Sequence, residues 1–177
     1  MGKFSIYSGI SGRVFLNYIL FHRVNDEEIK PCRTFFWGKL KDRIQGLDME
    51  AAILEINHWC AGEVMYQGTD ARTGSALEIY RSGVGRCGEE SVFAINALRS
   101  AGIPARQVYV PRWSHCDDNH AWVEVWCDGD WHYIGACEPE AVLDKGWFTN
   151  AASRAMMVSS RWYDKRCQMR ILSARMG

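Results

Sequence analysis

The sequence contains no long hydrophobic run, no Cys-x-x-Cys pair and no excess of charge of either sign. No stretch reaches the roughly 20 apolar residues that a membrane-spanning helix needs. The 21 basic and 21 acidic residues balance, so nothing indicates nucleic acid or an anionic membrane as a partner. Zinc-ligand spacing is also absent, because His115, Cys116, His120 and Cys127 follow no ligand pattern. We therefore expect no metal and no other cofactor.

The cysteines indicate a reducing compartment. There are seven of them, an odd number that cannot pair fully within one chain, and no disulfide-framework spacing appears. Residues 1–10 hold one lysine and no apolar run, so we expect no cleavable signal peptide. Both points favour a cytoplasmic protein. A secreted or periplasmic location would follow if the chain is a piece of a longer protein.

The composition is otherwise that of a globular protein. The chain has 177 residues, of which 47% are hydrophobic and 24% charged, enough for one domain with its own core. Eight tryptophans and seven tyrosines predict an aromatic-lined core or cleft, with core packing the commoner use.

Helical periodicity dominates the first hundred residues. Asp48 is a suitable N-cap, and the apolar residues that follow recur at helical spacing until Gly62. Residues 87–101 form the strongest predicted helix, with a wide apolar face and a stop at Gly102. Shorter helices are expected within residues 35–44 and 75–81, and residues 14–24 fit a strand or a short helix.

The period then changes to that of strands. Residues 120–127 alternate apolar and polar positions, and Asp128-Gly129 is a strong hairpin signal before residues 130–134. We also expect an extended segment at 107–110, loop or short helix at 149–160, and a final strand at 168–173. Helices first and antiparallel strands second predict an α+β fold.

Cys87 and His120 occupy positions suited to thiol chemistry. Cys87 lies between Gly85 and Gly88 at the start of the strongest helix, where the positive end of the helix lowers a thiol pKa. His120 begins the alternating strand, and an imidazole can take the thiol proton. A buried structural cysteine is the simpler alternative, but the two settings together favour a nucleophile and its base.

Four sequence blocks strengthen this interpretation. They are GRCGE at 85–89, LRSAGIPAR at 98–106, DNHAWVEV at 118–125 and DWHYI at 130–134. In this order they resemble the transglutaminase-like superfamily, in particular bacterial transglutaminase-domain proteins, whose fold is related to the papain-like cysteine proteases. The resemblance implies a central cysteine-bearing helix packed on an antiparallel sheet. It divides the chain into an N-terminal helical extension at 1–46, the core at 47–148 and a C-terminal segment at 149–177 that completes the same domain.

The resemblance also implies the catalytic roles. Cys87 would be the nucleophile and His120 the general base, while an aspartate is expected about four residues after Trp131. This chain has Gly135 there. Glu138 has the right chemistry to orient the imidazole, provided that the chain bends directly after Gly135.

Other roles around the cysteine remain open. An oxyanion hole would use the backbone N–H of Cys87 and a second donor, for which the upstream candidates are Trp59, Tyr66 and Gln67. Glu89 and Glu90 are expected to complement the helix N-terminus. Trp122 and Trp126 share the face of His120 and are expected to pack the sheet or line the cleft.

The predicted function is acyl transfer through a thioester. We expect a cysteine protease or peptidase type hydrolase of amide bonds, acting on a peptide or protein substrate. One alternative is a catalytically weak module that binds peptide or glycan with a degenerate triad. Another is a transglutaminase that cross-links protein glutamines. A peptide N-glycanase is weakly suggested by residues 135–138, but the cysteine pairs that accompany that family are absent.

Overall fold

The computed structural model describes residues 10–68, 73–163 and 169–174. Its centre is a five-stranded antiparallel sheet with the strand order β5-β4-β3-β6-β7. The strands are β3 (Ala105–Val110), β4 (His120–Cys127), β5 (Asp130–Ile134), β6 (Val158–Tyr163) and β7 (Met169–Ala174). A separate parallel pair joins β1 (Met65–Tyr66) to β2 (Val84–Gly85).

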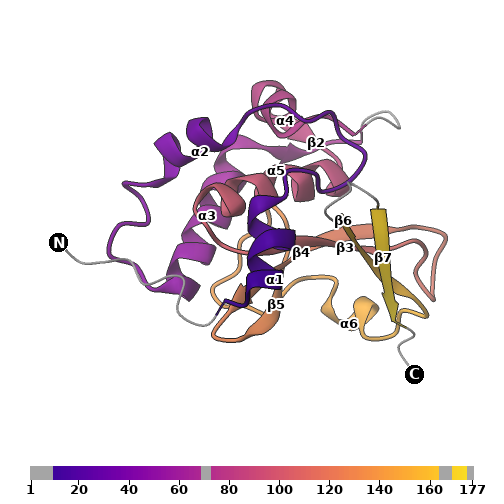
Figure 1. Ribbon diagram of the computed structural model, residues 1–177. Coiled ribbons are helices and arrows are strands. Elements are labelled where there is room, and N and C mark those ends of the chain that lie inside the picture. The colour runs from indigo at the N-terminus through magenta and orange to yellow at the C-terminus, as the bar shows by residue number, and fades with distance from the viewer. Residues whose placement is uncertain (1–9, 69–72, 164–168, 175–177) are drawn as a thin grey trace.

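Most helices gather on one side of this sheet, and the short α6 lies on the other (Figure 1). The helices are α1 (Gly12–Phe15), the π-helix η1 (Leu16–Leu20), α2 (Arg33–Leu40), α3 (Met49–Glu63), α4 (Ala76–Ser82), α5 (Cys87–Ser100) and α6 (Thr149–Ala152). None of the helices in the described ranges is both long enough and apolar enough to span a membrane. The fold is therefore α+β, as the sequence predicted.

Helix α5 is the centre of the larger core. Eleven of its residues are buried, from Glu89 to Arg99, and its apolar side chains pack with those of α2, α3 and α4 and with Val123 and Val125 of β4. Such complete burial explains why the apolar face predicted for this helix is so wide. It also fixes the helix, and the cysteine at its first position, against β4.

The opposite sheet face carries a second apolar cluster. It consists of Val108, Val110, Trp113, Trp122, Phe148 and Ala155. Val108 pairs with Trp122 and Val110 with His120 across the β3–β4 ladder. His120 therefore begins its strand beside an aromatic cluster.

The sequence placed most elements correctly. Asp48 caps α3 and accepts a hydrogen bond from the Ala51 N–H at 2.9 Å, and β4 has the predicted bounds 120–127. The expected final strand is β7, although Gln168 lies outside the described residues. The prediction of only loop or short helix at 149–160 was wrong after α6, because β6 begins at Val158.

Strand β6 is held by its partners. Its register with β3 pairs Val108 with Ser160, and the Ser160 hydroxyl donates to the Gln107 carbonyl at 2.7 Å. On its other edge β6 pairs along its length with β7. Ser159, Ser160 and Arg161 in the middle of the strand carry little strand signal, so pairing with both neighbours decides the structure there.

Candidate active site

Cys87 is the first residue of α5. Arg86 is the extended N-cap residue, and its backbone N–H donates to the Glu89 carboxylate at 3.2 Å. Upstream, β2 is fixed by its parallel pairing with β1. A short strand that runs directly into a helix thus places the thiol at the exposed N-terminal end of an otherwise buried helix.

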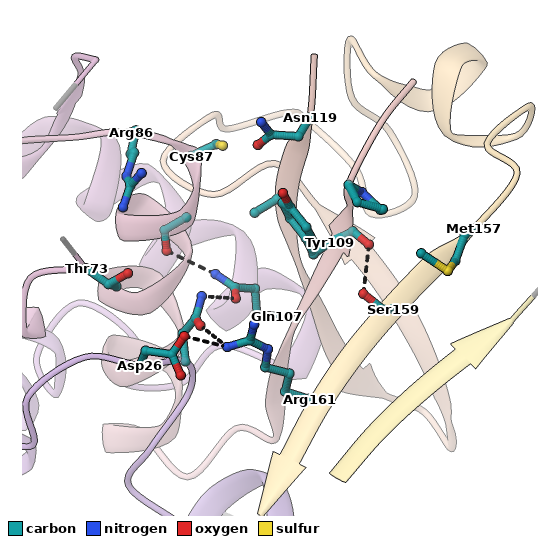
Figure 2. A pocket seen from close by; sticks show the side chains of 14 residues that line it. Asp26, Thr73, Arg86, Cys87, Gln107, Tyr109, Asn119, Met157, Ser159 and Arg161 are labelled. Atoms are coloured by element: carbon teal, nitrogen blue, oxygen red, sulfur yellow. Dashed lines mark hydrogen bonds and ion pairs between the residues drawn. The ribbon is translucent and has the colours of Figure 1, made fainter. Parts of the chain in front are cut away.

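The thiol opens into a cleft of about 430 Å³ between α5 and the sheet (Figure 2). Its lining includes Cys87, Arg86, Asn119, Tyr109, Met157 and Ser159. One wall is a hydrogen-bonded chain in which Asn25 Nδ2 donates to Gln107 Oε1 at 2.9 Å and Gln107 Nε2 donates to the Gly88 carbonyl at 3.0 Å. Because this chain ties β3 to the first turn of α5, it fixes the cleft beside the nucleophile.

The two residues that flank His120 in sequence, Asn119 and Ala121, line the same cleft as Cys87. Burial raises the pKa of the Cys87 thiol, while the backbone N–H groups of Ala121 and Gly88 oppose that rise. The direction is opposite to the one expected from the helix N-terminus alone. Desolvation of a half-buried thiolate outweighs the helix field here and favours the neutral thiol.

His120 is enclosed by aromatic rings. The centroid of its ring lies 4.8 Å from that of Trp147, 4.9 Å from Phe148, 6.0 Å from Trp113 and 6.2 Å from Trp122. Burial in this cluster lowers the pKa of His120 to about 4, although Asp118 opposes the shift. A neutral imidazole at pH 7 is the form that can accept a thiol proton. Its Nε2 atom is buried and has no hydrogen-bond partner within the part of the chain that the structure describes.

Glu138 follows the bend that the sequence requires. The Glu138 N–H donates to the Gly135 carbonyl at 3.2 Å, the two residues form an isolated antiparallel bridge, and Cys137 has a left-handed φ of 57°. The Glu138 carboxylate lies over Gly135, where an added Cβ would stand 2.6 Å from Oε2. The glutamate therefore fills the space beside position 135, where the family resemblance places an aspartate.

The Glu138 carboxylate accepts hydrogen bonds from Trp147 Nε1, 3.0 Å from each oxygen. Burial raises the pKa of Glu138, and the hydrogen bond from Trp147 opposes the shift. Among the described residues His120 Nε2 has no partner, so the carboxylate is bound by the indole that packs on the histidine and is not bonded to that nitrogen. Its role as orienting group stays a prediction.

Asn57 braces the turn before Glu138 and was missed in the sequence. Its Nδ2 donates to the Gly135 carbonyl at 2.9 Å and its Oδ1 accepts from the Cys137 N–H at 3.0 Å. Asn57 is only 1% exposed. The available signal was a polar residue on the apolar face of α3, directly after Ile56.

The two glutamates after Cys87 differ in environment. Glu89 accepts hydrogen bonds from the backbone N–H groups of Gly74 at 3.1 Å and Arg86 at 3.2 Å, as expected for a residue that caps the helix. Glu90 is buried, and burial together with Glu138 and Glu89 raises its pKa to about 8. The raised pKa favours the protonated form of Glu90, which limits the negative charge around Glu138.

The candidates for a second oxyanion donor separate by burial. Trp59 is 5% exposed and packs against Phe36, Tyr80 and Phe93, so its side chain is a core element. Tyr66 and Gln67 are exposed beside β2, and the Gln67 N–H donates to the Gly85 carbonyl at 2.8 Å. The strand pairing brings Gln67 beside the segment that leads to Cys87, and its role as donor stays a prediction.

A metal site in this protein would involve His115, Cys116, His120 or Cys127. Within the described ranges no three His, Cys, Asp or Glu side chains gather as a metal site would require. Cys116 is exposed in the loop before β4, whereas Cys127 is buried at the end of that strand.

Fold and site together define a papain-like α+β domain with a cysteine at the start of its central helix and a histidine at the start of the facing strand. The chain belongs to the transglutaminase-like superfamily, whose family model matches residues 38–136. No curated protein matches the chain.

Solved structures of similar fold agree with this assignment. A candidate cysteine protease from Cytophaga hutchinsonii is similar with a TM-score of 0.57 and 18% identity, over 96% of this chain and 58% of that protein. LapG from Legionella pneumophila is similar with a TM-score of 0.52 and 16% identity, over 71% of this chain and 73% of LapG. This chain thus spans less than two thirds of the length of the Cytophaga protein. At these identities the likeness establishes the fold.

Proposed function

We propose that this protein is a thiol-dependent hydrolase of amide bonds, of the cysteine protease or peptidase type. The observation that carries the proposal is the position of Cys87 at the open end of α5, in a cleft shared with both sequence neighbours of His120. The family and the similar fold of the Cytophaga protein support the same class of chemistry.

In the proposed reaction the neutral His120 removes the proton from Cys87 as the sulfur attacks an amide carbonyl. The Cys87 N–H at the helix start stabilises the oxyanion. Collapse of the tetrahedral intermediate forms a thioester, and the imidazolium gives its proton to the leaving amine. Water, activated by the same imidazole, then hydrolyses the thioester and restores the thiol.

Glu138 would hold the imidazole in a productive orientation and stabilise the imidazolium. Its carboxylate lies over Gly135 and is bound by the indole that packs on His120. To act on the imidazole the carboxylate would accept from His120 Nε2 as well as from the indole, and with about four acceptor positions a carboxylate can serve both donors. The pKa of about 4 for His120 makes such a partner necessary once the ring is charged.

The cleft suits an uncharged stretch of peptide. Arg161 is paired with Asp26 at 2.8 Å, and Arg86 Nε lies 3.8 Å from Glu89. Since these charges compensate each other, recognition would rest on polar groups such as Asn119 and Ser159 and on the apolar Met157.

A module that binds peptide or glycan without turnover is the second candidate. Two features favour it, because both indicate an incomplete triad. His120 Nε2 has no partner among the described residues, and position 135 has glycine in place of an aspartate. A cross-linking transglutaminase would use the same Cys87 and His120 and differ only in taking an amine in place of water.

One experiment separates these functions. The protein and its Cys87→Ala variant are incubated with a proteome-derived peptide library and a biotinylated alkylamine, and products are read by mass spectrometry. We expect new peptide N-termini that depend on Cys87, since loss of the nucleophile removes the thioester route. Amine-tagged glutamines would overturn hydrolysis in favour of cross-linking. Peptides retained equally by both proteins without cleavage would overturn catalysis in favour of binding.

A further inference from the structure

Trp147 lies between the two polar groups of the site. Its ring centroid is 4.8 Å from that of His120 and 5.8 Å from Phe148, while its Nε1 donates to both oxygens of Glu138 at 3.0 Å. The residue as a whole is 64% exposed. A tryptophan so exposed contributes little as core, so its contacts with the site need another explanation.

The backbone around Trp147 is shaped to hold this position. At Gly146 an added Cβ would stand 2.7 Å from the ring of Phe148, so only glycine allows Phe148 to fold back against the chain. Two residues earlier, Asp144 accepts a hydrogen bond from the Tyr133 N–H at 2.9 Å and pairs with His132 at 2.6 Å. The indole is thus presented from an anchored segment.

The partner of Trp147 is a carboxylate that has little other support. Glu138 lies over Gly135, and buried Glu90 is close enough to interact with it. Burial disfavours the charged carboxylate, and a negative neighbour would disfavour it further. The indole N–H is the only hydrogen-bond donor to the Glu138 side chain among the described residues.

We propose that Trp147 is a positioning residue of the thiol site, which holds the Glu138 carboxylate over Gly135 through its indole N–H while its ring packs on His120. The inference rests on the proposed function, in which Glu138 orients His120. Without the indole, the carboxylate would lose both its anchor over Gly135 and the donor that favours its charged form. An unanchored or protonated Glu138 cannot stabilise an imidazolium.

The test measures the rate at which iodoacetamide alkylates Cys87, site by site, from pH 5.5 to 9. Exposed Cys116 in the same molecule reports on intrinsic reactivity. The proteins are wild type, His120→Asn, Trp147→Phe, Glu138→Gln, the Trp147→Phe/Glu138→Gln double variant and Trp37→Phe. Trp37 is a matched control, because it is also exposed but lies on α2.

We expect Trp147→Phe and Glu138→Gln each to slow Cys87 alkylation at pH 7 by about five- to tenfold, the double variant to match Glu138→Gln, and Trp37→Phe to have no effect. Phenylalanine keeps a ring against His120 but lacks the N–H, so the rate of Trp147→Phe should recover toward wild type at higher pH, where Glu138 ionises without help. A purely structural role would lower the curve at every pH without moving it.

Two other outcomes would contradict the role of Trp147, and they can be told apart. Alkylation of Cys87 unchanged by Trp147→Phe, or losses that add in the double variant, would overturn the role of Trp147 while leaving the proposed function intact. If His120→Asn leaves Cys87 alkylation unchanged, the proposed function fails and the role of Trp147 fails with it.

Discussion

At the scale of single residues, Gly135 decides what the site can be. A side chain at this position and the present position of Glu138 exclude each other, since a Cβ would stand 2.6 Å from Glu138 Oε2 and 2.9 Å from Glu138 Cβ. A carboxylate supplied from position 138 therefore requires glycine at 135. The glycine at position 135, where an aspartate was expected, and the bend that places Glu138 over it therefore depend on each other.

Replacing Gly135 by alanine should displace Glu138 and destabilise the fold by about 1–3 kcal/mol, because the new methyl group meets atoms of Glu138 at less than contact distance. Urea unfolding measures the stability, and alkylation of Cys87 measures the site. Gly62→Ala is the control, because its added Cβ meets nothing within 4 Å and α3 should gain helix propensity. Equal stability of the two variants would contradict the close contact.

At the scale of elements, the segment after β5 connects the sheet to the site. Its fixed points are the turn at Gly135, braced by Asn57, and the pairing of Asp144 with His132 of β5. Glu138 lies between these two points in the chain, and Trp147 follows just after the second. The precision of the site therefore depends on contacts made by residues outside it.

The His132–Asp144 pair predicts a pH-dependent stability. The hydrogen bond that His132 Nδ1 donates to the Asp144 carboxylate raises the pKa of His132 above its ordinary value of 6.5. A folded-state pKa above the unfolded one stabilises the protein fully below about pH 6.5, and this contribution is lost as the pH rises through the folded pKa. Between pH 5.5 and pH 8.5 the urea midpoint should decrease less in His132→Gln than in wild type, because the titrations of His120 and Glu90 contribute equally to both proteins. The exposed His58 serves as control, and His58→Gln should keep the full decrease. The same pH dependence in His132→Gln and wild type would rule the pair out as its source.

At the scale of the whole molecule, the N-terminal segment and the cysteine helix share one core. Phe36 of α2 is fully buried and packs edge-to-face on Phe93 of α5, with ring centroids 5.5 Å apart. Leu40 and Ile44 are buried in the same cluster. The segment predicted as an extension therefore packs directly on the helix that begins at the nucleophile.

Phe36→Ala should cost about 3–5 kcal/mol, as expected for a large cavity in a packed core, and the protein should still unfold in a single transition. Phe35→Ala next to it should cost far less, because Phe35 is 41% exposed. Calorimetry of the two variants makes the comparison. A separate early transition in Phe36→Ala would mean that the segment unfolds as an independent unit.

The sequence alone determined the local structure around the chemistry. Glycines beside Cys87, the apolar period of α5 and the alternation of β4 depend on neighbours within a few residues. The α+β class, the position of Cys87 at a helix start and the position of His120 at a strand start were therefore predictable. Strand β6 was not predicted, because Ser159, Ser160 and Arg161 in its middle carry little strand signal and are extended through pairing with β3 and β7.

Only the tertiary structure decided the state of the site. The helix N-terminus predicted an acidic thiol, yet burial raises the pKa of Cys87 and lowers that of His120. Desolvation depends on atoms brought from distant parts of the chain, and no local pattern records it. The sequence could offer Glu138 as a candidate for the group that orients His120. The contacts of Asn57 and Trp147 that hold Glu138 come from distant parts of the chain, so they appear only in the folded protein.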